Sequence, residues 1–267
     1  MVDFQYKESY DVYDLKKLVS VLRGDGGCPW DREQTHDSIR RNLLEEAYEV
    51  AEAIDEGNPE HLREELGDLL LQVVFHSEME ESAGRFALDD VSDGICKKLI
   101  LRHPHIFGDV RVSGSGEVLK NWDSIKREEK QLMTASSSMD AVAKSLPALW
   151  RAEKIQKKAA KVGFDWPDVS GALDKISEEL NELKEAVETG RGISEELGDL
   201  LFTAVNASRF LNTDPEDALN KSSDKFIARF SRLEEIAAER GLDPENLNLI
   251  ELDKLYQEAK TDLKNRK

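Results

Sequence analysis

The sequence predicts an all-α protein that contains two similar helical units. Glycine and proline, which interrupt helices, supply only 16 and 7 of the 267 residues, too few for many short strands joined by turns. Apolar residues recur at spacings of three and four along much of the chain, as they do on one face of a helix. The motif EELGDLL at 64–70 returns at 195–201, which indicates an internal duplication.

In the first half, helix signals predict four main segments. An apolar series from Ile39 to Ile54 ends at Gly57 and predicts one amphipathic helix, with Asp31 and Gln34 as a capping box before it. Asn58-Pro59-Glu60 has the cap, proline and early acid of a helix start and predicts a second helix to about residue 83. Two shorter helices are expected at 89–102 and 117–131.

Residues 131–146 are rich in serine and alanine and show no strong period, which predicts a linker. Beyond it, helices are expected at about 147–162, 168–189, 193–211, 215–240 and 248–265. We therefore expect an N-terminal helical domain over 1–130 and a C-terminal one over 147–267.

The charge balance limits the classes of partner. Lys and Arg number 37 against 55 Asp and Glu, so the net charge is −18 and the field repels nucleic acids and acidic membranes. The apolar runs are far shorter than the roughly 20 residues that span a bilayer, and the first residues do not resemble a signal peptide. We expect a cytoplasmic protein with no membrane segment and no general nucleic-acid binding, in which a phosphorylated ligand needs a metal ion or local basic residues.

Each half carries Glu-x-x-Glu on one helix and Glu-x-x-Asp on the next. Residues three apart share a helix face, so two antiparallel helices can set the pairs against each other. Two carboxylates about 4 Å apart repel by around 4 kcal/mol at an effective dielectric constant near 20, so such a cluster needs cations or protons. Oxygen ligands suit Mg²⁺ or Mn²⁺. The predicted metal ligands are Glu46, Glu49, Glu65 and Asp68 in the first half and Glu179, Glu182, Glu196 and Asp199 in the second.

A solvated acidic face is the alternative for any one of these helices. The second helix of the first half argues against it, because a broad apolar arc lies on one side of Glu65 and Asp68 and further apolar residues lie on the other. A helix that is apolar almost all round is expected to be buried, with its acids at the edge of a core. The arc consists of Leu62, Leu66, Leu69, Leu70 and Val73.

Periodicity leaves open which acid of each adjacent pair is the ligand. Glu45 and Glu49, like Glu178 and Glu182, also share a face at four-residue spacing. In the same way, periodicity does not decide between Glu64 and Glu65, or between Glu195 and Glu196. We assign the outer acids, Glu178 and Glu195 in the second half, to supporting roles in which they position water or the hydroxyls of a ligand.

Several motifs closely resemble the tandem-domain MazG family of nucleoside triphosphate pyrophosphohydrolases. They are CPWD at 28–31, EEAYE at 45–49, EELGDLL at 64–70, RHPHIFGD at 102–109, SLPALWRAEKIQKKAAKVGFDW at 145–166, then EELNE and the second EELGDLL. The resemblance implies an all-α NTP pyrophosphatase fold, a four-helix core completed by dimerisation, and Mg²⁺-dependent conversion of NTPs to NMP and pyrophosphate. It also implies that the C-terminal repeat is the main catalyst.

Basic residues provide an independent reason to expect the second half to be the better phosphate site. Lys175 lies four residues before Glu179 and shares its helix face, whereas Asn42 holds the matching position before Glu46. We expect Lys175 to serve in catalysis and phosphate binding, with Lys225 and Arg229 adding positive charge from a later helix. In the family an aromatic side chain of the last helix packs on the nucleotide, and Tyr256 stands at about that place; simple packing is its alternative.

With no nucleophilic side chain indicated, the expected chemistry is direct attack by a metal-activated water. The resemblance implies that this water attacks the α-phosphorus, and we expect a role in nucleotide-pool housekeeping or a stress response. A di-iron bundle is disfavoured, because neither Glu65 nor Glu196 has a histidine three residues further on. The remaining alternative is a non-catalytic bundle that binds nucleotides or a protein partner.

Overall fold

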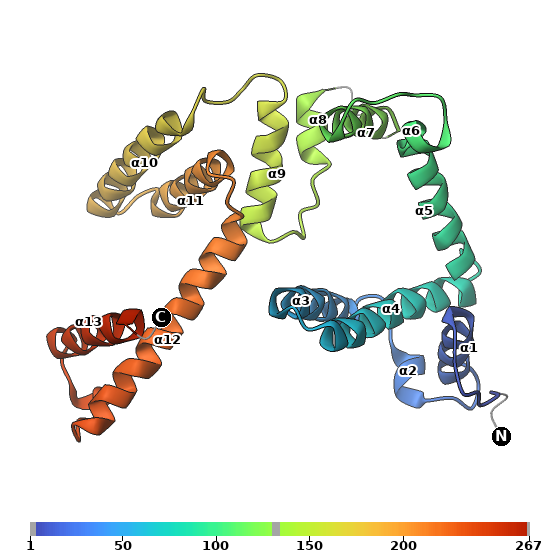
Figure 1. Ribbon diagram of the computed structural model, residues 1–267, viewed down its shortest axis with the longest axis horizontal. Coiled ribbons are helices and arrows are strands. Elements are labelled where there is room, and N and C mark those ends of the chain that lie inside the picture. Colours follow the sequence, from blue (N-terminus) through green and yellow to red (C-terminus); the bar gives the residue numbers. More distant parts are fainter. Residues whose placement is uncertain (1–3, 130–133, 266–267) are drawn as a thin grey trace. The chain divides into compact units, whose positions relative to one another are not determined.

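Helices form the regular structure in the computed structural model, which describes residues 4–129 and 134–265 (Figure 1). Over these two ranges the chain contains no strand. It divides into two compact units, Met1–Lys126 and Arg127–Lys267. The all-α prediction is confirmed.

The first unit is organised around the long helix α4 (Pro59–Ser82), which contacts α1 (Val12–Arg23), α3 (Arg40–Glu56) and α5 (Leu88–Arg102). Apolar residues of the C-terminal part of α4 meet those of its neighbours in a small core. The buried members are Val19, Ile39, Val74, Phe75, Met79 and Leu88. The remaining helices are α2 (Pro29–Glu33), α6 (Pro104–Phe107) and α7 (Ser115–Glu129).

Local signals define the α3–α4 hairpin. Gly57 ends α3 in the left-handed conformation, with φ of 65°, which glycine adopts without steric cost. The side chain of Asn58 then accepts hydrogen bonds from the backbone of Glu60 and His61, as predicted for the start of α4. The predicted capping box is wrong, because Asp31 lies inside α2 and α3 begins after Ile39 without a side-chain cap. The proline at position 29 supports a separate short helix there.

The second unit contains a matching hairpin, α10 (Val169–Thr189) and α11 (Ile193–Phe210), with α9 (Ala148–Ala160) against α11. A second pair, α12 (Pro215–Glu239) and α13 (Leu249–Asn265), has its own core around Leu233, Ile236 and Leu255. A short 3-10 helix, η1 (Pro244–Asn246), precedes α13. The side chain of Asp214 caps α12 by accepting a hydrogen bond from the Asp217 backbone, as its cap-and-proline start predicts.

The expected burial of the carboxylate helices is wrong for their N-terminal turns. Leu66 and Leu70 of α4 are 48% and 40% exposed, and Leu197 and Leu201 of α11 are 46% and 51% exposed. The buried residues of α4 begin only at Gln72. Periodicity identifies an apolar face but not what covers it, and within one chain this face of each hairpin lies at the surface.

Residues 131–133 of the predicted linker, 131–146, lie outside the described residues, as do the last two residues, 130 and 131, of the helix expected at 117–131. The described part of the linker contains α8 (Ala135–Asp140), where the Thr134 side chain accepts a hydrogen bond from the Ser137 backbone. Helix α8 contacts α9. The limits of the two domains remain a prediction. In the described part of the chain, no helix is both long and apolar enough to cross a bilayer.

Candidate metal and phosphate site

Three carboxylates converge between α10 and α11. Glu179 of α10 and Glu196 and Asp199 of α11 offer oxygen atoms that all lie within 4.8 Å of one another. The two helices are antiparallel neighbours joined at Gly190 and Gly192, with φ of 68° and 72°, so their facing turns meet. The duplicated motif therefore forms a compact cluster of acids in the second half.

The three acids of this cluster differ in their exposure to solvent. Glu179 is 5% exposed, whereas Asp199 is exposed and Glu196 is intermediate. Glu182 lies beside them at an exposed position, and desolvation, followed by the charge of Glu179, raises its pKa above the usual value of 4.5. Like charges are held together, so the site has the negative potential that attracts a cation.

Lys175 is the basic residue of the cluster. Its Nζ atom lies 2.8 Å from Oε1 of Glu178 and 2.8 Å from Oε1 of Glu179. Hydrogen bonds to Glu178 and then Glu179 raise the pKa of Lys175 above its usual value, so it stays protonated at neutral pH. The predicted placement of Lys175 beside the first acid pair is found in the structure, and its side chain is 33% exposed and accessible to a ligand.

The first half has a similar cluster between α3 and α4. Glu46, Glu49 and Glu65 offer oxygen atoms within 4.8 Å of one another. Burial raises the pKa of Glu46 above its usual value of 4.5, and the charge of Asp68 is the next contribution. Both acids of each predicted pair are thus close enough to influence this site.

His61 is a residue near this cluster that sequence reasoning missed. Its Nε2 atom lies 3.2 Å from Oε1 of Glu65, and its Nδ1 atom lies 2.7 Å from Oε2 of Glu56. Hydrogen bonding to Glu56 is the main reason that the pKa of His61 is raised above 6.5. The four-residue spacing to Glu65 was the available signal. In the second half Gly192 takes the matching position, so only the first cluster has a histidine competing for its carboxylate.

The hairpins distinguish the acids that periodicity could not. Glu46 and Glu179 belong to the clusters, while Glu45 is exposed and paired with Arg41 at 2.7 Å. Glu178 lies at the rim of its cluster, with its side chain 58% exposed and bound to Lys175. Glu195, in the first turn of α11, is exposed.

Three other predicted ligand-binding residues lie on the α12–α13 pair. Lys225 is exposed, Arg229 is intermediate, and neither forms an ion pair with any described residue. Tyr256 packs against the α12–α13 core, with its ring 5.7 Å from that of Phe226. Figure 1 shows α13 against the part of α12 away from the α10–α11 hairpin. Within one chain the structure does not bring these residues to the carboxylate cluster, and their roles stay predictions.

The donor set of the second cluster fits a hard divalent cation. All three converging ligands are carboxylates, and oxygen ligands are those that Mg²⁺, Mn²⁺ and Ca²⁺ prefer. Glu179 is nearly inaccessible to water and is paired with Lys175. Glu196 and Asp199 add two further carboxylates, so the cluster keeps a negative charge that a bound cation would offset.

Fold and site together define a class: an all-α protein in which a duplicated helical hairpin gathers carboxylates beside a lysine. The sequence matches the model of the MazG nucleotide pyrophosphohydrolase domain twice, at residues 34–107 and 169–233. These matches contain the two carboxylate hairpins.

Curated relatives extend the likeness over nearly the whole chain. A Thermotoga maritima protein named nucleoside triphosphate pyrophosphohydrolase/pyrophosphatase MazG is 47% identical over 247 residues, which cover 92% of this chain and 94% of the relative. An Escherichia coli K12 nucleoside triphosphate pyrophosphohydrolase is 45% identical over 254 residues, 92% of this chain and 97% of the relative. The chain belongs to the MazG nucleotide pyrophosphohydrolase family, and the predicted tandem arrangement is confirmed.

Proposed function

We propose that the protein hydrolyses nucleoside and deoxynucleoside triphosphates to the monophosphate and pyrophosphate, with Mg²⁺ as cofactor and Mn²⁺ as a substitute. The observation that carries this proposal is the convergence of Glu179, Glu196 and Asp199 beside Lys175. The names of the relatives from T. maritima and E. coli support the reaction and the substrate class.

In this proposal Glu179, Glu182, Glu196 and Asp199 hold the cation in the second half. When bound, a divalent cation polarises phosphate oxygens and lowers the pKa of water. Hydrolysis forms a bond between a water oxygen and the α-phosphorus and breaks the bond to the β-phosphate oxygen, so pyrophosphate leaves.

Lys175 has two roles in this reaction. In the free protein it is bound to Glu178 and Glu179, and in the complex its ammonium group offsets the negative charge that develops on the phosphates. Glu178 and Glu195 orient water or the hydroxyls of the sugar from the rim of the cluster. Because Lys175 is only one positive charge, Lys225 and Arg229 are proposed to supply further charge, and Tyr256 to contact the nucleotide.

The first half is proposed to bind metal through Glu46, Glu49, Glu65 and Asp68 and to contribute less to hydrolysis. It has Asn42 in place of Lys175, and His61 is bound to Glu65. The contact of His61 with Glu65 competes with metal binding by that carboxylate, and the missing lysine removes a contact to phosphate. Both differences would weaken triphosphate binding in the first half.

A homodimer is proposed as the working assembly. The apolar N-terminal turns of α4 and α11 are exposed within one chain, and burying them in a twofold interface would remove apolar area from water. Such pairing would also let residues of α12 and α13 approach a cluster from a second copy. We place the protein in the cytoplasm, in nucleotide-pool housekeeping or a stress response, in keeping with its acidic charge and family.

The decisive experiment is a panel of NTPs and dNTPs incubated with purified protein and Mg²⁺, with products separated by ion exchange. We expect NMP and pyrophosphate. Release of NDP and phosphate would contradict the choice of the α-phosphorus. No hydrolysis of any nucleotide would favour the alternative of a non-catalytic binding bundle.

A further inference from the structure

Two histidine rings of the first unit are in direct contact. His36 lies in the segment 34–39 between α2 and α3, and His76 lies on α4. Their Nδ1 atoms are 2.7 Å apart. The ring planes are 5° from parallel and their centres are 5.0 Å apart, so nitrogens this close must meet at the ring edges. The contact is therefore a hydrogen bond in which one Nδ1 atom donates and the other accepts.

The other nitrogen of His36 determines which ring donates. Its Nε2 atom lies 2.5 Å from Oε1 of Glu80. Hydrogen bonds from Arg85, with help from His36, hold the pKa of Glu80 at about 2, so this carboxylate is an ionised acceptor and His36 donates to it from Nε2. A neutral His36 then has a bare Nδ1 atom, and His76 supplies the bridging proton from its own Nδ1. The Nε2 atom of a neutral His76 is left without a proton.

This bare Nε2 atom of His76 is buried and has no hydrogen-bond partner among the residues that the structure describes. The other three ring nitrogens of the pair are already engaged in hydrogen bonds. If both bonds stay intact, an added proton can bind only at Nε2 of His76, whichever ring then holds the bridging proton. That proton would create a buried N–H group without an acceptor, which is costly. Proton uptake therefore favours an arrangement in which the bridge is broken.

The electrostatic surroundings act in the same direction. Burial, followed by the charge of His36, lowers the pKa of His76 below its usual value of 6.5. Over the described parts of the chain, the His76 ring has no hydrogen bond or ion pair with a carboxylate that would stabilise its cationic form. The charged groups on the elements around the pair are Glu80, Arg85, Arg23 and Lys16 of α1, Asp37, Arg40 of α3, and Asp89 of α5.

The bridge holds a segment that has few other ties to α4. Helix α3 begins after Ile39 without a side-chain cap, so its start depends on tertiary contacts. Arg23 donates to the backbone oxygen of Gln34 at 3.3 Å, and Ile39 belongs to the same buried core as Val74. The His36–His76 bond lies between these two anchors and ties the middle of the segment to α4.

The bridge is a feature of the first half alone. The aligned acid motifs pair His36 with Val169 and His76 with Ala207, so the second half has no histidines at these places. Neither histidine belongs to the carboxylate cluster of the first half. The pair is therefore separate from the candidate metal ligands.

We propose that His36 and His76 form a proton-operated latch, which on acidification releases the segment 34–39 and loosens the start of α3. The latch is closed when the two rings share one bridging proton, and it opens when the pair takes up another. In the closed state the folded protein binds fewer protons than the unfolded chain. The stability that the latch supplies is therefore complete above about pH 6.5 and is lost as the pH falls below that value.

The first test identifies the ring protons directly. Long-range ¹H–¹⁵N correlation spectra of the wild-type protein at about pH 7.5 distinguish the two neutral tautomers of each imidazole. The variants His36→Asn and His76→Asn assign the signals. We expect the Nε2–H form for His36 and the Nδ1–H form for His76. A proton on Nε2 of His76 at this pH would overturn the latch, because proton uptake would then not require the buried position.

The second test measures opening of the segment. Hydrogen exchange of the backbone amides in 34–39 and in the first turn of α3 is measured at about pH 7.5 and about pH 5.5, with correction for the intrinsic effect of pH. We expect the corrected exchange to be about tenfold faster at the lower pH, as loss of one hydrogen bond allows. Equal corrected rates at the two pH values would overturn the proposal.

The variant His76→Asn separates titration from simple contact. An asparagine amide can donate from about the place of Nδ1 but does not titrate, so we expect slow corrected exchange at both pH values. His103→Asn is the matched control, because Nδ1 of His103 bonds to the backbone oxygen of Leu99 at 2.6 Å, outside the latch. The control should keep the pH response of the wild type. A pH response that is lost in both variants, or in neither, would contradict the latch, and the two wild-type tests stand even if His76→Asn does not fold.

Discussion

Lys175 and Glu179 form an ion pair, 2.8 Å apart, one helical turn from each other on α10. Glu179 is 5% exposed and belongs to the carboxylate cluster. The ammonium group of Lys175 therefore contacts a candidate metal ligand and also Glu178 at the rim of the cluster, and its side chain is 33% exposed. This pair has no equivalent in the first half, where Asn42 precedes Glu46 by the same four residues.

We expect Lys175→Ala to lower kcat/KM for NTPs by roughly a hundredfold, because one lost contact to developing charge costs a few kcal/mol. Lys175→Arg should keep part of the activity. Circular dichroism should show an intact helical fold in both variants, since Lys175 lies at the surface of α10. An active Lys175→Ala variant would remove this residue from the mechanism.

The two halves should respond unequally to loss of their acids. We expect Glu196→Ala or Asp199→Ala to abolish most NTP hydrolysis, since both carboxylates belong to the cluster beside Lys175. The matched changes Glu65→Ala and Asp68→Ala should leave most of it, or alter substrate range and stability. Steady-state kinetics of the four variants decides the ranking, which would be reversed if the Glu65 change alone removed activity.

Metal removal should abolish hydrolysis. The second cluster gathers acids around a nearly buried Glu179, and such a site repels a triphosphate unless a cation is present. We expect activity to vanish in excess EDTA and to return on addition of Mg²⁺ or Mn²⁺. Full activity in excess chelator would contradict the mechanism.

Sedimentation should show a homodimer. Leu66, Leu70, Leu197 and Leu201 are each at least 40% exposed, and apolar faces of this kind are stabilised by association. Replacing Leu70 and Leu201 by glutamate should shift the protein toward monomer. An active monomer of the wild-type chain at micromolar concentration would be inconsistent with this assembly.

Glu80 provides a pH-dependent contribution to stability in the first unit. Hydrogen bonds from Arg85, with help from His36, hold its pKa at about 2, below the usual 4.5. The ionised form of Glu80 is therefore more stable in the folded protein than in the unfolded chain. This stabilisation is complete above about pH 4.5 and is lost as the pH falls toward 2.

Urea unfolding of wild type and Glu80→Gln at several pH values measures this effect. We expect the variant to be less stable at pH 7 and the difference to shrink between about pH 4.5 and pH 2. Glu52→Gln, at an exposed position of α3, serves as the control. A difference that does not depend on pH would show that the Glu80 pair adds nothing beyond packing.

The sequence by itself determined the helical fold and the tandem arrangement, and it predicted which acids could form each cluster. Helix starts at Pro59 and Pro215 and the end at Gly57 follow from caps, proline geometry and left-handed glycine, which act within a few residues. The repeated spacing of Glu and Asp is equally local. The wrong capping box at Asp31 shows the limit of such local signals. Residues of the short helix α2 were assigned to the start of the next helix, α3, because the two lie close together in the sequence.

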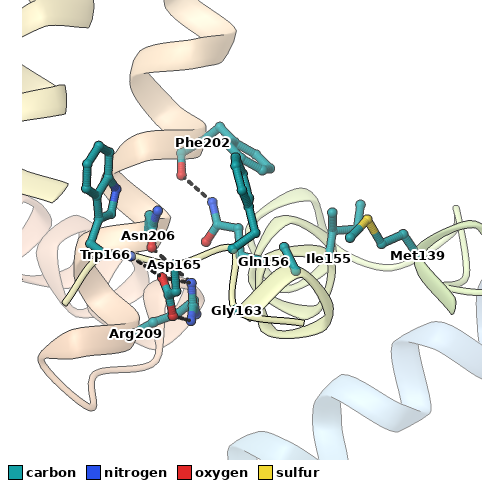
Figure 2. Close-up of a pocket in the computed structure, with 11 residues that line it drawn as sticks. Met139, Ile155, Gln156, Gly163, Asp165, Trp166, Phe202, Asn206 and Arg209 are labelled. Atoms are coloured by element: carbon teal, nitrogen blue, oxygen red, sulfur yellow. Dashed lines mark hydrogen bonds and ion pairs between the residues drawn. The ribbon is translucent and has the colours of Figure 1, made fainter. Parts of the chain in front are cut away.

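Only the tertiary structure decided which acids face each other and what surrounds them. Adjacent residues on a helix differ by about 100° in direction, so Glu178 and Glu179 are equivalent candidates until α11 fixes the inner face of α10. The orientation of the Gln156 amide depends on its hydrogen bond to the backbone oxygen of Phe202 (Figure 2), a residue of another helix that lies 46 positions further along the sequence. The exposure of Leu66 and Leu201 likewise depends on which neighbours cover them. Such contacts arise from packing between distant segments, and neither local propensity nor periodicity encodes them.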